Sequence, residues 1–184
     1  MKKTILAAVT LISVVFVGTA NAQTTADVTV NIKLQPVYTL VVNPGQNTIN
    51  LVYTTKNDYA NGVSSLAQAN HLTVFSTGGF VINAKTGGDF TNAKDAEVIE
   101  ASTVSVVATD GSAAPVGGDL TYTKQNLSNS DKQIIKSTKG GRDKNFNITY
   151  EGAGDDAYIN MFSKGRDASE NVYKATVTYT IVAD

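Results

Sequence analysis

The chain contains no cysteine and no tryptophan, and it has one histidine and three prolines in 184 residues. Without cysteine it forms neither a disulfide nor a thiolate zinc site, so packing and strand pairing must hold the fold together. A serine triad needs a histidine oriented by a carboxylate, and we interpret His71, at the start of a predicted strand, as a structural or surface residue. We therefore predict no catalytic residue, no cofactor and no metal site, and we do not expect an enzyme.

Acidic residues do gather in one part of the sequence. Asp143, Glu151, Asp155 and Asp156 lie close together, and hard cations such as calcium prefer oxygen ligands. Their spacing does not match an EF-hand loop, and the adjacent pair Asp155 and Asp156 is typical of a polar turn. Calcium therefore stays a minor alternative to a metal-free chain.

Long hydrophobic runs are missing except at the N-terminus. Lys2 and Lys3 precede a short apolar run from Ile5 to Val17, and Ala20-Asn21-Ala22 provides the small residues of a cleavage site. The run of about 13 residues is short for a membrane span, which needs about 20. We predict a signal peptide over residues 1–22, with an uncleaved anchor as the alternative.

The rest of the chain, residues 23–184, has the length of a single domain with one core. The chain has 15 basic and 16 acidic residues, and two of the basic ones lie in the predicted signal peptide. The remaining weak negative charge argues against nucleic acid or an anionic membrane as a partner. We expect an exported chain in the periplasm, at the cell surface or outside the cell, without membrane insertion of the mature part.

The clearest structural pattern lies at the C-terminal end. Apolar residues occupy every second position from Tyr173 to Ile181 and alternate with lysine and threonine, which is typical of a half-buried strand. The segment 27–34 has the same period. Its apolar face consists of Val28, Val30, Ile32 and Leu34.

Short strand patterns separated by glycine, asparagine, aspartate and serine fill the sequence between these two segments. Thr77-Gly78-Gly79 predicts a hairpin between its flanking strands. Asn61-Gly62 predicts a turn, and residues 64–69 predict a loop or one helical turn. The pattern favours an all-β fold, an immunoglobulin-like β-sandwich of about 8–10 short strands, over a closed barrel. The strands are predicted at 37–42, 48–54, 71–76, 80–85, 98–108, 120–123, 132–137, 145–150, 157–162 and 173–182.

In these two terminal segments the chain resembles bacterial chaperone–usher pilins of the cysteine-free kind, and related secreted β-sandwich proteins whose last strand has a Tyr-x-Ala/Gly-x-Val-x-Val pattern. The resemblance implies that Val28, Val30, Ile32 and Leu34 form a donor strand for a neighbouring subunit. It also implies an acceptor edge in the last strand and, as partners, further copies of the chain, related surface subunits and a periplasmic chaperone. The acceptor residues would be Tyr173, Val177, Tyr179 and Ile181.

The match has departures. Such pilins typically carry a glycine about fourteen residues from the end and a penultimate tyrosine, whereas this chain has Glu170 and Asn171 in that region and Ala183 before the last residue. Pairing of segment 27–34 within its own domain therefore stays open beside donor exchange. The alternative function is a secreted binding module for a carbohydrate, cell-wall or host ligand, with the polar loops 89–95 and 112–119 as its binding surface.

Overall fold

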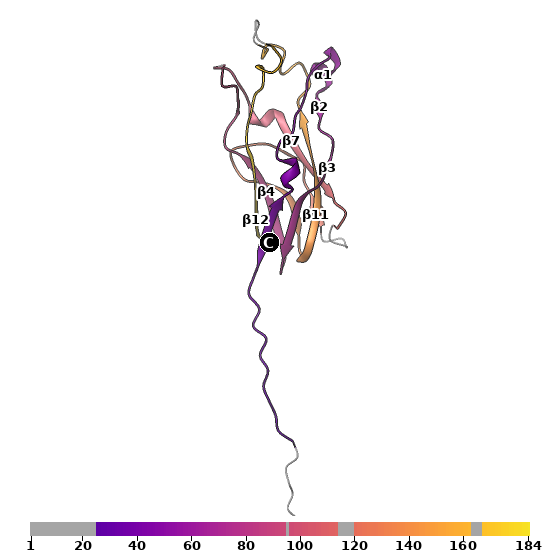
Figure 1. Cartoon of the computed structure of the whole chain (residues 1–184), viewed down its shortest axis with the longest axis vertical. Helices are drawn as coiled ribbons and strands as arrows, with labels where there is room; N and C mark the ends of the chain where they lie inside the picture. Colours follow the sequence, from indigo (N-terminus) through magenta and orange to yellow (C-terminus); the bar gives the residue numbers. More distant parts are fainter. Residues whose placement is uncertain (1–24, 95, 114–119, 163–166) are drawn as a thin grey trace, which may run out of the picture. The chain divides into compact units, whose positions relative to one another are not determined.

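The computed structural model describes residues 25–94, 96–113, 120–162 and 167–184 (Figure 1). By its internal contacts the chain divides into two compact units, Met1–Leu34 and Gln35–Asp184. The predicted signal peptide lies outside the described residues. None of the helices in the described part is both long and apolar enough to cross a membrane.

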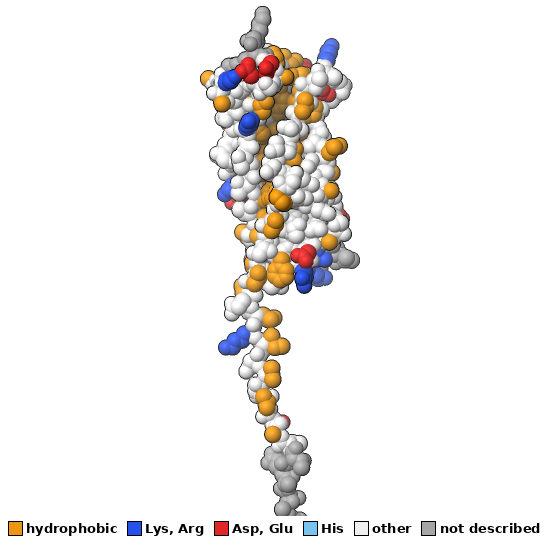
Figure 2. Space-filling view, in the orientation of Figure 1, with side chains coloured by type: hydrophobic (Ala, Val, Ile, Leu, Met, Phe, Trp, Pro, Cys, Tyr) orange, Lys and Arg blue, Asp and Glu red, His pale blue; other side chains and the backbone are white. Residues whose placement is uncertain are grey.

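The described end of the first unit, residues 25–34, carries neither helix nor strand. Its four alternating apolar side chains are all exposed, at 81–86% of their full area. Figure 2 shows hydrophobic side chains along one side of the extended segment. A lone strand has no ladder partner, so the predicted strand at 27–34 remains a prediction about an assembled form.

The regular structure of the second unit consists mainly of strands, and its paired strands are antiparallel. Its larger sheet has the order β1-β3-β11-β7-β9, with β2 paired to β11, and its smaller sheet has the order β12-β4-β10-β8. A separate ribbon consists of β5 and β6. The strands are β1 (Tyr38–Val42), β2 (Val63–Ser64), β3 (Gln68–Ser76), β4 (Phe80–Thr86), β5 (Phe90–Thr91), β6 (Val98–Ile99), β7 (Val104–Asp110), β8 (Leu120–Tyr122), β9 (Gln125–Asn126), β10 (Lys132–Ser137), β11 (Gly141–Gly152) and β12 (Val177–Ala183).

Three short helices connect these strands: η1 (Pro44–Gln46), α1 (Lys56–Asn61) and η2 (Ala101–Thr103). The α1 helix begins with a capping box: the side chain of Thr55 accepts the backbone N–H of Asp58, and the side chain of Asp58 accepts the backbone N–H of Thr55. It ends at Gly62, whose φ of 80° is a conformation that favours glycine.

Both larger sheets contribute side chains to one shared core. Period-two alternation directs Leu72, Val74, Phe146 and Ile148 of the larger sheet inward, and all four are fully buried. The rings of Phe80 and Phe146 meet edge to face at 6.2 Å and join the two sheets. The all-β prediction is therefore confirmed.

Two of the corners at which the chain passes from one sheet to the other, after β3 and after β10, use the same local chemistry. Ser76 at the end of β3 accepts the N–H of Gly78 and donates its hydroxyl to the carbonyl of Gly78, and Ser137 at the end of β10 does the same with Lys139. A Cβ on Gly140 would lie 2.3 Å from the carbonyl oxygen of Ser76, so only glycine fits there.

The predicted hairpin around Thr77-Gly78-Gly79 is wrong in its pairing. The strands β3 and β4 follow each other as expected, but β3 pairs with β1 and β11 while β4 pairs with β12 and β10. Alternating burial is consistent both with a hairpin in one sheet and with a corner between two sheets. The corner places the inward faces of β3 and β4 on opposite sides of the same core.

The strand predicted at 157–162 is also wrong. This segment forms successive turns closed by the bonds from Ile159 N–H to Asp156 C=O and from Met161 N–H to Tyr158 C=O. Its short apolar run fits several local structures, and the burial of Tyr158 favours the turn because its hydroxyl then donates to Thr103 Oγ1 at 2.7 Å.

Candidate binding cleft

The two larger sheets have two pairs of edges, and these differ. On one side β8 and β9 are joined by two residues, so the chain itself passes from the smaller to the larger sheet; we call this side the closed seam. On the other side β1 and β12 lie next to each other without a hydrogen-bonded ladder. We call that side the open seam, and Figure 2 shows hydrophobic side chains gathered along this face.

One wall of the open seam is formed by residues 47–54, which follow β1 and η1. The segment alternates as a strand does: Ile49, Leu51 and Tyr53 are half-buried, whereas Asn50 and Val52 point to solvent. No strand is assigned to it, because no neighbouring strand pairs with it in the described chain. The hydroxyl of Tyr53 donates to the carbonyl of Ala153 at 2.7 Å and fixes the end of this wall.

The opposite wall is formed by residues 171–176, which lead into β12. Lys174 exchanges both backbone hydrogen bonds with Thr91 of β5, at 2.8 and 3.0 Å. In an extended chain the adjacent residues direct their backbone groups to the other side, so those of Tyr173 and Ala175 face away from Thr91. The hydroxyl of Tyr173 donates to the carbonyl of Met161 at 2.9 Å.

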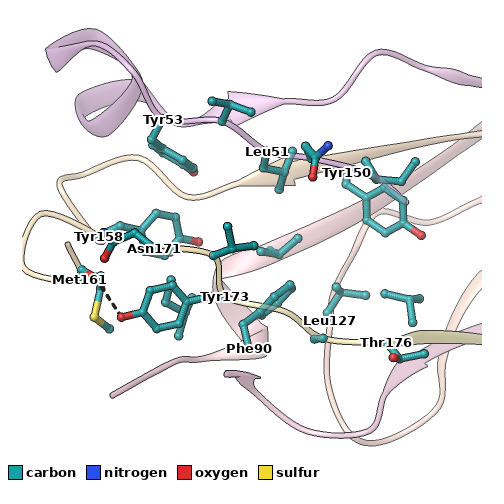
Figure 3. A pocket seen from close by; sticks show the side chains of 18 of the residues that line it. Leu51, Tyr53, Phe90, Leu127, Tyr150, Tyr158, Met161, Asn171, Tyr173 and Thr176 are labelled. Carbon is teal, nitrogen blue, oxygen red and sulfur yellow. Dashed lines mark hydrogen bonds between the residues drawn. The ribbon is translucent and has the colours of Figure 1, made fainter. Parts of the chain in front are cut away.

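A cleft of about 640 Å³ lies between the two walls. Figure 3 shows Leu51 and Tyr53 along one side and Phe90 and Tyr173 along the other. Its floor includes the core residues Val104, Leu127 and Tyr150. Among the described residues that line it there is no Asp, Glu, Lys or Arg, so the lining is suited to burying apolar side chains.

A small polar group sits at the floor of this cleft. Gln46 donates its amide to the carbonyl of Ala69, so its Oε1 accepts the Nδ1–H of His71 at 3.0 Å. The ring of His71 meets Tyr179 edge to face at 5.8 Å, and the hydroxyl of Tyr179 is bonded to that of Tyr150.

The groups in this floor are neutral near pH 7. Burial lowers the pKa of His71 from its ordinary value of 6.5. Burial also raises the pKa values of Tyr150 and Tyr179, and the neighbouring Tyr150 adds to the effect on Tyr179. An apolar ligand entering the cleft therefore meets no ionised group there.

The structure brings most of the predicted acceptor residues to this cleft. Tyr173, Val177 and Tyr179 line it, while Ile181 lies further along the same face of β12 and packs against the core. His71, set aside as structural, lies in the cleft floor. The predicted donor residues belong to the other unit of the chain and are exposed.

Sequence reasoning missed other parts of the cleft. Phe90 and Ile99 reach it from the two-residue strands β5 and β6, and Met161 and Phe162 reach it from the irregular segment after Tyr158. Strands this short show no periodicity that would mark a residue as inward-facing. Of the two loops predicted for ligand binding, 89–95 begins at the β5 ribbon, where Asp89 accepts the N–H of Ala101 at 2.9 Å. Residues 95 and 114–119 lie outside the described residues.

Fold and cleft together define a class: an antiparallel β protein with two sheets on one core and one unsealed side. No family model matches the chain, and a search of the curated proteins finds no match either.

Proposed function

We propose that the chain is an exported, non-enzymatic surface subunit with an immunoglobulin-like fold, and that it assembles by strand addition. In this proposal residues 27–34 of one copy enter the open seam of the next copy. The periplasm, the cell surface or the extracellular space is the place of assembly, and a chaperone that shields the open seam beforehand is an expected partner.

The observation that carries the proposal is the open seam itself. Two extended segments flank an uncharged cleft whose floor is the hydrophobic core, and the wall at 47–54 has no strand beside it in the described chain. Burying one large apolar side chain contributes about 1.5–3 kcal/mol, so leaving this strip open to water is unfavourable. A strand with one apolar face closes such a strip, because it buries that face and forms backbone hydrogen bonds along both walls.

The chain itself contains a segment with the required properties. Val28, Val30, Ile32 and Leu34 present a continuous apolar face, and all four are more than 80% exposed. Exposed aliphatic side chains at this density mark an interaction surface rather than an ordinary solvated segment. The match between an unfilled apolar cleft and an unburied apolar ribbon makes a second copy the natural occupant.

Cysteine trapping tests the proposal cleanly, because the chain has no cysteine of its own. Copies carrying Ala175→Cys in the cleft wall are mixed with copies carrying one cysteine at position 28, 30, 32 or 34. We expect an intermolecular disulfide at the position or positions whose side chains face the cleft, and a ladder of oligomers when both cysteines are in one chain. The matched control is Lys33→Cys, which lies on the opposite face of the ribbon and should crosslink much less.

A truncated chain that starts after Pro36 gives the second test. It should lose polymerisation, and a peptide covering Thr25–Leu34 should bind to it, whereas the same peptide with Ile32→Asp should not. A purified chain that stays monomeric and gives equal crosslinking at positions 32 and 33 contradicts the proposal and favours the binding-module alternative.

A further inference from the structure

A second hollow lies on the outer face of the larger sheet. On β7, Val104 and Val106 point into the core, so Ser105 between them points outward. Ser105 lies opposite Glu151 of β11 on one side and opposite Asn126 of β9 on the other. The small serine between two longer side chains leaves a depression of about 350 Å³.

Polar side chains make up most of the lining of this depression, which also includes Gly152 and Ala153. Lys124 and Glu151 form an ion pair at its border, so their charges compensate each other. Asn61 of α1 and Ser102 of η2 also line it.

Two of these polar groups have unused hydrogen-bonding capacity. Ser105 is only 6% exposed, yet within the described chain neither its hydroxyl nor the side-chain amide of Asn126 has a hydrogen-bond partner. Among the described residues, Thr86 Oγ1 is the one side-chain oxygen that is fully buried without a hydrogen-bond partner, so the hydroxyl of Ser105 is open to water in the depression. A ligand hydroxyl can replace that water and form the hydrogen bond with Ser105 in its place.

The chemistry of the lining selects the ligand. An apolar group would leave Ser105 and Asn126 unsatisfied, and a charged ligand would have to compete with the Lys124–Glu151 pair. A hydroxyl both donates and accepts, and so does each serine and amide of the hollow. The volume lies at the lower end of the range for small-molecule sites, about 300–1,000 Å³.

We propose that this hollow, bordered by Ser105, Asn126 and the Lys124–Glu151 pair, binds a neutral polyhydroxylated ligand, namely a single sugar residue. The site is separate from the open seam and does not depend on assembly. A surface subunit with this site would carry a sugar-binding position on each copy, and a weak affinity per site would be multiplied along an assembly.

The test is a titration of the isotope-labelled chain with the methyl glycosides of glucose, galactose, mannose and N-acetylglucosamine, followed by NMR of the backbone amides. We expect at least one sugar to give saturable shifts at Ser105, Asn126 and Glu151 at millimolar concentration. Ser105→Val fills the hollow and removes the hydroxyl, and it should weaken binding about tenfold or more. Asn126→Ala, at an exposed edge, provides a second variant that is expected to fold normally.

Ser64→Val is the matched control, because Ser64 lies in the same cross-strand row, opposite Glu151, but outside the hollow. It should leave binding unchanged. The proposal is overturned if none of the four sugars gives saturable shifts, if the shifts map to the open seam, or if Ser105→Val binds as tightly as the unmodified chain. Comparing the methyl glycoside that binds with a trisaccharide ending in that sugar distinguishes a free sugar from a glycan terminus as the source.

Discussion

The two seams of the second unit differ in how the edges of the two sheets are covered. At the closed seam Ile135 of β10 pairs with Tyr122 of β8 and is fully buried, and the hydroxyl of Tyr122 donates to Asp110 of the other sheet at 2.6 Å. At the open seam Val177, Tyr179 and Ile181 of β12 have the same inward orientation but are only half-buried. Leu120 and Tyr122 of β8, the edge strand at the closed seam, are half-buried as well, so the full burial of Ile135 reflects a strand that has hydrogen-bonded neighbours on both sides.

The largest expected effect is the loss of stability when an isoleucine is truncated to alanine, and we compare this loss between the two seams. Ile135→Ala removes a fully buried side chain and should lower the free energy of unfolding by about 2–5 kcal/mol. Ile181→Ala makes the same chemical change at the half-buried edge and should cause a clearly smaller loss. Urea unfolding of the chain and both variants measures the difference, and equal losses would mean that the open seam is covered in solution.

The second prediction closes the open seam with a peptide. Adding the Thr25–Leu34 peptide to the chain that starts after Pro36, at a hundredfold excess over its dissociation constant, should raise the free energy of unfolding by about 2.7 kcal/mol. Amide hydrogen exchange should slow at residues 48–53 and change little at β8 and β9, which already have partners. Uniform protection over the whole chain would point to a general effect of binding rather than to a new strand at this seam.

The third prediction concerns the pH dependence of stability that His71 gives to the open seam. Because burial lowers the folded pKa of His71 below 6.5, the unfolded chain takes up a proton first as the pH falls. The stability that neutral His71 contributes is complete above pH 6.5 and decreases as the pH falls below it toward the folded pKa. A His71→Gln variant should lack this decrease between pH 7 and 5 in urea unfolding.

The carboxyl groups of Asp58 and Asp167 titrate below the pH range in which the effect of His71 is measured. Hydrogen bonds from Thr54 and Thr55 lower the pKa of Asp58, and bonds with Ser169 lower that of Asp167, so both titrate below their ordinary value of 3.8. Identical pH profiles for the chain and for His71→Gln would show that His71 is not buried in the floor of the cleft.

The smallest expected effect concerns one hydrogen bond in the wall of the open seam. Tyr53→Phe removes the bond to the carbonyl of Ala153 and should lower the free energy of unfolding by about 0.5–1.5 kcal/mol. It should also weaken binding of the peptide, because the wall at 47–54 loses its anchor. Tyr59→Phe is the control, since Tyr59 contacts the ring of Tyr53 without a hydroxyl hydrogen bond in the described chain. If the two variants behave alike, the hydroxyl of Tyr53 has no role in this wall.

Much of the fold was predictable because strands can be recognised from the local alternation of apolar and polar residues. The strands predicted at 37–42, 71–76, 80–85, 132–137 and 145–150 fall on β1, β3, β4, β10 and β11. The pattern at Tyr173–Ile181 also marked the correct face of β12, although the ladder begins only at Val177. By contrast, the apolar residues at 157–162 fitted a strand and form turns, because the position of Tyr158 is decided by Thr103, more than 50 residues away.

The candidate cleft was predictable in its edges but not in its floor. Tyr173, Val177 and Tyr179 followed from alternation and from the resemblance to pilins, whereas Phe90 comes from a strand of two residues and Met161 from an irregular segment, neither of which shows a pattern. The polar hollow around Ser105 was missed for a related reason. Glu151, Ser105 and Asn126 become neighbours only through strand pairing over up to 46 residues, which local sequence does not encode.

By itself, the sequence determined that this protein is built of short strands without disulfides, and it marked the inward face of the segment 173–181, because alternation depends on neighbours one or two positions away. Only the tertiary structure decided that β3 and β4 belong to different sheets and that one seam is joined by the chain while the other is left open. The physical reason is that strand pairing and burial depend on which distant segments meet, and the same alternating segment is stable at a closed seam and available for a partner at an open one.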